Sequence, residues 1–107
     1  MNHNLGEFEE LVLLAVGALD PEAYGVALLG HLEGSLGRRV NISAIHVALK
    51  RIEDKGFVKS KFGGITNERG GRRKKFYSIT GLGKRVLAYQ YSLRTGMYKQ
   101  IPKTIWG

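Results

Sequence analysis

Hydrophobic residues recur every three or four positions in four stretches of the chain, which is the spacing of one buried helix face. The pattern predicts four helices, over residues 6–19, 23–32, 41–56 and 80–97. Between the third and fourth helices, aromatic and β-branched residues at 57–62 and 76–79 are typical of two short paired strands. The chain is therefore predicted to be mainly α with a small β-hairpin, an α+β fold.

The second helix is expected to bury Val26, Leu29 and Leu32 and to end in the glycine-containing segment 34–37. Val40 follows two arginines and is expected to form a strand of one or two residues before the third helix. Three helices with a tight connection before the third predict a helix-turn-helix, with residues 24–33 as its supporting helix.

The third helix carries the clearest signals. Asn41 is expected to cap its start, and Gly56 to end it in the left-handed conformation. One face is apolar and predicted buried: Ile42, Ile45, Leu49 and Ile52. The opposite face is predicted to contact DNA: Ser43, Ala44, His46, Val47, Lys50 and Arg51. A helix followed by a hairpin with a cationic tip is how a winged helix-turn-helix meets DNA, with the recognition helix in the major groove and the wing on the backbone or minor groove.

The hairpin tip is rich in glycine and in cations. Residues 63–71 are too long for a tight turn, and we expect this loop to be poorly ordered without DNA. The predicted DNA-binding cations of the wing are Arg69, Arg72, Arg73, Lys74 and Lys75. Side chains of an extended segment alternate, so two of the four in the run 72–75 should point to each side. The alternative interpretation is that these four cations are ordinary solvated surface residues. Their position directly after a helix-turn-helix favours DNA binding.

Charge is unevenly spread along the chain. Residues 1–36 contain no Lys or Arg and six acids, a net of −6, whereas residues 37–107 contain all 17 basic residues and three acids, a net of +14. Together they give the chain its net charge of +8. Such asymmetry indicates one face suited to a polyanion, although a generic basic protein would have the same composition.

The fourth helix is predicted to mediate dimerisation. Thr80 is expected to cap it, and its apolar stripe is longer than the core of a small winged helix requires. The expected dimer contacts are Leu82, Val86, Tyr89, Leu93 and Met97, together with Phe8 of the first helix. This divides the chain into a DNA-binding part, 1–80, and a dimerisation helix with its tail, 81–107. The alternative is that the fourth helix folds back over its own domain.

Several classes of protein are not supported. The chain has no cysteine, and His3, His31 and His46 lie at no metal-ligand spacing, so no metal, cofactor or catalytic activity is expected. The longest apolar stretch, 11–19, is far shorter than the roughly 20 residues of a membrane span. A cytoplasmic protein of a reducing compartment is expected.

Four blocks, in this order, resemble the PadR family of bacterial transcriptional regulators: L-V-L-L-A-V at 11–16, A-Y-G-V at 23–26, the block 45–58 and G-G-R-R-K-K-F-Y-S-I-T-G-L-G-K at 70–84. The similarity spans about residues 5–90. It implies a winged-helix homodimer that binds an operator in double-stranded DNA and usually represses transcription, sometimes under the control of a small effector.

The chain departs from this family pattern at two positions. His46 stands where the family usually has tyrosine, and Arg73 where the wing often has proline, which removes a rigid residue and adds a charge. His46 is interpreted as an exposed ring that donates a hydrogen bond to a DNA phosphate. The alternative is a half-buried histidine that packs at the start of the helix. Tyr91, Tyr98 and Trp106 are candidates for an effector pocket at the dimer seam, as in some related regulators; the alternative is that Trp106 pins the tail to the core or is disordered.

Two functions of different classes remain open on the sequence. The first is a dimeric, sequence-specific DNA-binding regulator in which Lys50 and the face 43–47 discriminate bases while Arg72 and Arg73 add sequence-tolerant affinity. The second is a winged-helix module that binds another protein. The cationic wing favours the first, because lysine is depleted in protein–protein interface cores. Double-stranded RNA is a lesser option, since its deep, narrow major groove would not admit the helix.

Overall fold

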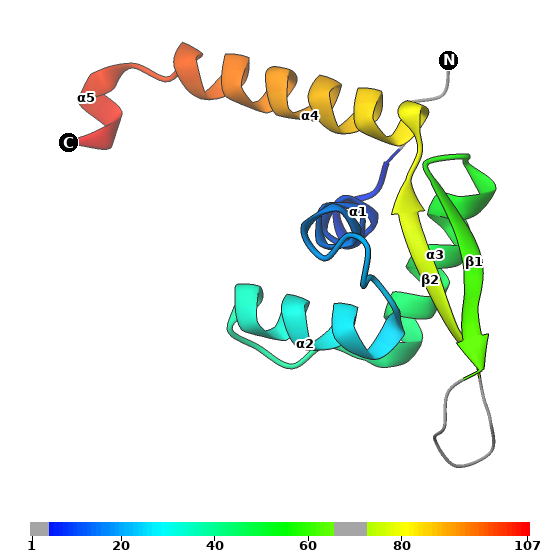
Figure 1. Cartoon of the computed structure of the whole chain (residues 1–107). Helices are drawn as coiled ribbons and strands as arrows, with labels where there is room; N and C mark the ends of the chain where they lie inside the picture. The colour runs from blue at the N-terminus through cyan, green and yellow to red at the C-terminus, as the bar shows by residue number, and fades with distance from the viewer. Residues whose placement is uncertain (1–4, 66–72) are drawn as a thin grey trace.

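The computed structural model describes residues 5–65 and 73–107. The elements in chain order are α1 (Glu7–Ala18), α2 (Gly25–Leu36), α3 (Ile42–Asp54), β1 (Val58–Ile65), β2 (Arg73–Ile79), α4 (Gly81–Gln100) and α5 (Lys103–Trp106). Helices α1, α2 and α3 form a bundle with the β1–β2 hairpin at its side, while α4 crosses above α1 (Figure 1). The predicted mainly α fold with a small hairpin is confirmed.

The hydrophobic core lies where the first three helices meet. On α3, Ile45, Leu49 and Ile52 are fully buried and Ile42 is half-buried, as the helical spacing predicted. Val12, Leu13 and Val16 of α1 face them. Because every buried position of α3 lies on one side, its other side is left to solvent.

The prediction for α2 is confirmed for Leu32, which is buried, and for Leu29, which packs against the core, but it is wrong for Val26. Val26 is 70% exposed, and Leu28, one helical turn before Leu32, is buried instead. The helix continues through the segment 34–36 and ends at Gly37, which has a φ of +66° and donates its N–H to the Glu33 carbonyl. Neither Gly34 nor Ser35 forces an end, because only the left-handed residue provides the capping geometry.

Val40 does not form a strand. It lies in the connection between α2 and α3, where its N–H donates to Glu33 Oε2 at 2.9 Å. This side-chain acceptor satisfies the group that a strand partner would otherwise pair. The predicted boundaries of α3 are confirmed, since Asn41 Oδ1 accepts from the Ser43 N–H at 2.7 Å and Gly56, with a φ of +83°, follows the helix.

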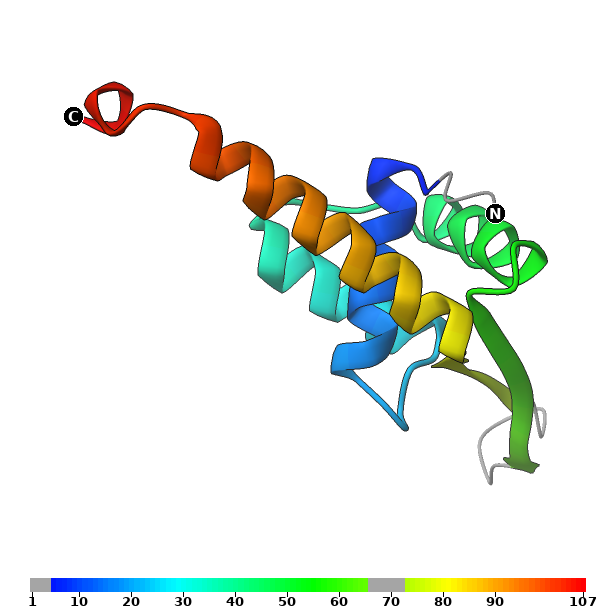
Figure 2. The ribbon, with the colours of Figure 1, turned by 90° about the horizontal axis from the view of Figure 1, so that it is seen from above.

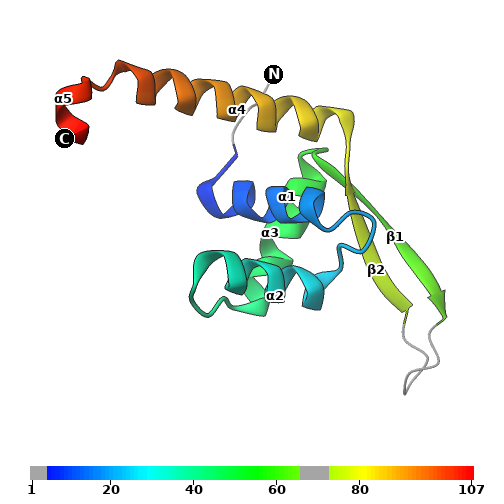
Figure 3. The same ribbon diagram turned by 60° about the vertical axis from the view of Figure 1, so that its left-hand side comes forward.

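The two strands pair antiparallel, with Ser60 opposite Tyr77 and Phe62 opposite Lys75, and the register shifts between Phe62 and Ile65. Both strands are longer than predicted, because the hairpin ladder extends through the glycines at 63–64. The remaining part of the predicted mobile loop, at 66–71, lies outside the described residues. The hairpin projects beyond the helices at the side of α3 (Figures 1 and 3).

Helix α4 begins at Thr80, whose Oγ1 accepts from the Gly83 N–H at 3.0 Å, as predicted. Only its first turns pack into the core, where Val86 is 1% exposed. Its second half runs past α1 and carries α5 to the far end of the molecule (Figure 2). The part of the chain that the structure describes has no helix long and apolar enough to cross a membrane.

Candidate nucleic-acid interface

The outward face of α3 is an exposed surface of six side chains. It consists of Ser43, Ala44, His46, Val47, Lys50 and Arg51, all of them exposed. The face combines short polar, apolar and cationic groups, which are the types that read base edges and thymine methyls in the major groove. The same helix therefore has one side fixed in the core and one side available for recognition.

Lys50 is paired in the free protein. Its Nζ lies 3.3 Å from Asp54 Oδ1, one helical turn away, and both side chains are exposed. An exposed pair of this kind contributes about 0–1 kcal/mol. Lys50 can therefore exchange the Asp54 carboxylate for a phosphate or a guanine edge at little cost.

His46 is exposed and lies beside the start of α2. A Cβ atom at Gly25 would lie 3.0 Å from His46 Cε1, so glycine at this position makes room for the imidazole. The contact orients His46 at the junction of the two helices of the helix-turn-helix. A ring held there is able to donate a hydrogen bond outward.

The cations of β2 divide between two environments. Arg73 and Lys75 are exposed, whereas Lys74 is half-buried, with its Nζ 4.4 Å from the centre of the Tyr24 ring. Tyr24 in turn packs edge-on against Phe76, with ring centres 5.6 Å apart. A cation over an aromatic face is held by the ring quadrupole, so Lys74 ties the wing to the start of α2. Arg69 and Arg72 lie outside the described residues.

Glu53, near the end of α3, connects this helix to the β1–β2 hairpin. Its Oε2 accepts a hydrogen bond from Ser60 Oγ at 2.5 Å, and its Oε1 lies 3.9 Å from Lys75 Nζ. One carboxylate thus contacts both strands of the hairpin. The position of the wing relative to α3 is set by these contacts and by the Lys74–Tyr24 pair.

A groove of about 560 Å³ separates the start of α2, α3 and the wing strand. It is lined by Tyr24, Gly25, Val26, Ile42, His46, Arg73, Lys74, Lys75 and Tyr77. Helix, groove and strand form one surface, which we call the reading surface: the exposed face of α3, this groove and the exposed cations of β2. Among the predicted site residues, the groove brings His46 of α3 together with Arg73, Lys74 and Lys75 of β2; the other predicted residues of α3 lie on its exposed face outside the groove.

Sequence reasoning missed several residues of this region. Tyr24 and Val26 line the groove, and Lys59 and Lys61 are exposed on β1. The two lysines are two residues apart, and this spacing in the sequence predicts that both lie on the same face of the strand. Nothing local marks Tyr24, whose role depends on Lys74, fifty residues later.

Acids are concentrated elsewhere. Glu9 of α1 pairs with Lys55 at 2.5 Å, and Glu10 pairs with Arg94 of α4 at 3.0 Å. Both pairs balance cations that are not part of the reading surface. Within residues 5–65 and 73–107, no group of three His, Asp or Glu side chains is placed to hold a metal ion.

The predicted dimer contacts fall into two groups. Val86 lies in the protomer's own core, and Leu82 and Phe8 are partly buried against that core. The other three, farther along α4, are exposed by about half of their area: Tyr89, Leu93 and Met97. Of the six predicted contacts, these three are the ones left exposed for another chain, and Tyr91 and Tyr98 of the same helix are exposed as well.

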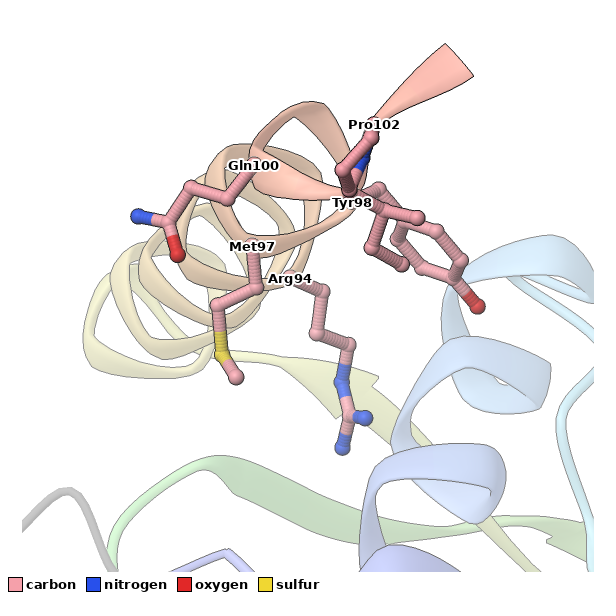
Figure 4. Close-up of a pocket in the computed structure, with 6 residues that line it drawn as sticks. Arg94, Met97, Tyr98, Gln100 and Pro102 are labelled. Atoms are coloured by element: carbon pink, nitrogen blue, oxygen red, sulfur yellow. The ribbon is translucent and has the colours of Figure 1, made fainter. Parts of the chain in front are cut away.

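The three candidate effector residues do not form one pocket within a protomer. Tyr98 and Trp106 stack with ring centres 6.2 Å apart, and Tyr91 is exposed. The groove at the end of α4, about 460 Å³, has Tyr98 as its only aromatic wall; Figure 4 shows Arg94 and Met97 on the same side of the helix and Pro102 beside Tyr98. Trp106 is 62% exposed and does not pin the tail to the core.

Known folds match this arrangement closely. A PadR-like transcription factor from Bacteroides fragilis superposes with a TM-score of 0.72 at 16% identity, over 86% of this chain and 84% of its own. A PadR family transcription regulator from Clostridium difficile R20291 gives 0.69 at 22% identity, over 88% and 93%. Bacillus subtilis PadR, solved in complex with operator DNA, gives 0.68 at 21% identity, over 82% of this chain and 48% of its own.

The sequence comparisons agree with the fold. No curated protein sequence matched this chain. Residues 13–89, well over half of the chain, match the family described as the transcriptional regulator PadR-like family. This matched segment contains α2, α3, both strands and the start of α4, and it therefore includes every element of the reading surface. The chain belongs to the PadR-like family of transcriptional regulators.

Proposed function

We propose that the protein is a homodimeric, sequence-specific DNA-binding regulator that represses transcription by occupying an operator. Helix α3 enters the major groove and the β1–β2 wing contacts the backbone or the adjacent minor groove. The observation that carries this proposal is the reading surface, in which an exposed recognition face is continuous with the exposed cations of β2. The operator complex of the similarly folded Bacillus subtilis PadR supports it.

The division of labour follows from the residue types. Lys50, His46 and the short side chains of α3 discriminate bases, while Arg73 and Lys75 contact phosphates and add affinity that depends little on sequence. In the complex a base edge replaces Asp54 as the partner of Lys50, and a phosphate replaces Glu53 as the partner of Lys75.

The dimer is proposed to form through the exposed half of α4, where Tyr89, Leu93 and Met97 leave half of their area open. In this arrangement residues 1–80 bind DNA and residues 81–107 join the protomers. An isologous dimer matches a palindromic operator with half-sites about 34 Å apart, one turn of DNA.

A titration with two duplexes tests DNA binding. The purified protein is titrated with its own upstream DNA and with a scrambled duplex of equal length, at several salt concentrations. The double variant Arg73→Ala, Lys75→Ala should weaken binding to both duplexes and flatten the log-log salt dependence by about one to two units per half-site. Lys50→Ala should instead reduce the preference between the duplexes.

A matched control removes equal charge elsewhere. Lys84 and Arg85 are exposed at the start of α4, outside the reading surface, so Lys84→Ala, Arg85→Ala should leave the salt slope unchanged. Equal flattening by both double variants would mean that net charge alone acts. If the unmodified protein bound neither duplex at low salt, a protein-binding module would replace the DNA proposal.

Sedimentation tests the dimer separately. Leu93→Asp places a charge in the stripe and should give monomers that keep the helical circular dichroism of the parent protein. A variant that still sediments as a dimer would show that the seam lies elsewhere.

A further inference from the structure

The C-terminal tail, residues 101–107, presents large apolar side chains that the described part of the protomer leaves mostly exposed. Ile105 of α5 is 70% exposed, and Trp106 is 62% exposed although one side of its ring stacks on Tyr98. Figures 1 and 2 show α5 at the far end of the molecule, beyond α1 and α2. An exposed aromatic and aliphatic pair of this kind marks an interaction surface.

A second apolar feature lies between α1 and α2. Leu11, Leu14 and Ala18 form one wall of a groove of about 240 Å³, and His31, Ser35 and Leu36 contribute to the other. Leu14 is 48% exposed. Small-molecule pockets usually measure about 300–1,000 Å³. This groove is below that range and is better suited to one or two protein side chains.

The segments that contain the two features differ in charge. The groove is lined by apolar residues with His31 and Ser35, and its walls belong to the segment 1–36, which contains no Lys or Arg and has a net charge of −6 in the sequence. The tail contains Lys103 and follows closely on Lys99, and no acidic residue follows Glu68 in the sequence. Association of tail with groove is therefore electrostatically favourable, whereas two tails would repel one another.

We propose that the tail of one protomer docks into the α1–α2 groove of its partner, with Trp106 and Ile105 as the inserted side chains. This inference rests on the proposed dimer and names an additional contact within it. The exchange is reciprocal in an isologous dimer, since each protomer has one tail and one groove. Helix α4 carries the tail past α1 and α2, to the far end of the molecule (Figure 2).

The area available on α4 supports a second contact. Side chains of the size of tyrosine bury at most about 150–250 Å² each, so three half-exposed ones offer about 300 Å² per protomer. Stable interfaces bury about 1,200–2,000 Å² in total, twice what this stripe supplies from both protomers. The surface buried when Ile105 and Trp106 dock against the groove walls supplies a large part of the missing interface area.

Intrinsic fluorescence tests the proposal directly, because Trp106 is the only tryptophan of the chain. In the dimer its emission should shift to the blue and acrylamide quenching should fall, relative to Leu93→Asp monomers. Ser35→Arg, in the groove, should abolish both changes in protein that remains dimeric. The control Gly34→Arg adds the same charge one position earlier, where a Cβ meets nothing within 4 Å, and should keep them. Equal exposure of Trp106 in dimer and monomer would overturn the proposal.

Cross-linking identifies which chain supplies the groove. The sequence has no cysteine, so Ile105→Cys protein can be mixed with Ser35→Cys protein under mild oxidation. A covalent dimer should form in the mixture and in neither protein alone. Covalent tail-to-tail dimers of Ile105→Cys alone would overturn the docking, as would an internal disulfide in the double variant.

The affinity of the dimer gives a third measurement. Trp106→Ala should raise the dimer dissociation constant at least about tenfold, as expected for a buried aromatic hot spot. A dimer of unchanged affinity that yields no tail-to-groove cross-link would overturn the docking but leave the dimer intact. A parent protein that is monomeric at all concentrations would overturn both.

Discussion

Replacing Gly83 by alanine is expected to destabilise the protein, although alanine is the better helix former. Gly83 lies in the first turn of α4, where the helix rests on the start of the hairpin. A Cβ atom there would lie 2.2 Å from the Phe57 carbonyl oxygen and 2.8 Å from Ile79 Cγ2. The Phe57 carbonyl oxygen belongs to the backbone and cannot rotate out of the way, so α4 and the hairpin must separate.

The magnitude follows from three contributions. Alanine in place of an exposed helical glycine stabilises by about 0.5–1 kcal/mol. Overpacking a closely packed site costs about 1–3 kcal/mol. Separation also strains the hydrogen bond from the Thr80 N–H to the Phe57 carbonyl, 3.0 Å long, which contributes about 1 kcal/mol. The net change for Gly83→Ala is a loss of about 1–3 kcal/mol.

Urea unfolding at a fixed protomer concentration measures this change, because the stability of a dimer depends on concentration. With a slope of about 1–3 kcal/mol per molar urea, the midpoint should fall by about 1 M. Gly96→Ala is the matched control in the same helix, since a Cβ there meets nothing within 4 Å, and it should gain about 0.5–1 kcal/mol. Equal stabilisation of both variants would refute the close approach of α4 to Phe57.

Two further substitutions test local interactions. Asn41→Ala removes the acceptor of the Ser43 N–H and should cost about 1 kcal/mol in thermal or urea unfolding, whereas Asn41→Asp should retain most of the stability. Glu9→Gln removes one charge of the largely buried pair with Lys55, which joins α1 to the end of α3, and should cost about 1–3 kcal/mol; a loss under 0.5 kcal/mol would show that the pair is solvated.

The sequence predicted α3 well because three independent signals agree there. Asn41 and Gly56 mark its two ends by capping chemistry, and the spacing of its apolar residues leaves only one face to bury. The exposed recognition face followed from the buried one without further information. In the same way, Thr80 predicted where α4 begins, because a capping side chain bonds to residues that are close to it in the sequence.

The face of α2 was not predictable because its sequence, G-V-A-L-L-G-H-L-E-G-S-L, has apolar residues on more than one side. Packing against α1 and α3 buried Leu28 beside the predicted Leu32 and left Val26 exposed, and tertiary contacts of this kind leave no local pattern. The contacts that hold the wing have the same origin. Glu53 with Ser60 joins a helix to a strand, and Lys74 reaches Tyr24 across fifty residues of sequence.

One junction connects all the parts of the proposed regulator. Thr80 accepts from the Gly83 N–H and donates its own hydroxyl to the Gly56 carbonyl, while its N–H donates to Phe57. These hydrogen bonds hold the end of α3, the segment leading into β1 and the start of α4 together, so a rigid junction joins the proposed recognition helix, wing and dimer helix.

In the proposed dimer, this rigidity makes the separation of the two α3 helices depend on how the exposed halves of α4 pair. Helix α4 has 20 residues and is about 30 Å long. A change of about 10° in its direction at the seam would therefore move each recognition helix by about 5 Å relative to a half-site spacing of about 34 Å. A displacement of that size is about one and a half base-pair steps and would remove the helix from its base contacts. Any molecule that binds at the end of α4 and alters the pairing angle would thus regulate DNA binding without touching the reading surface.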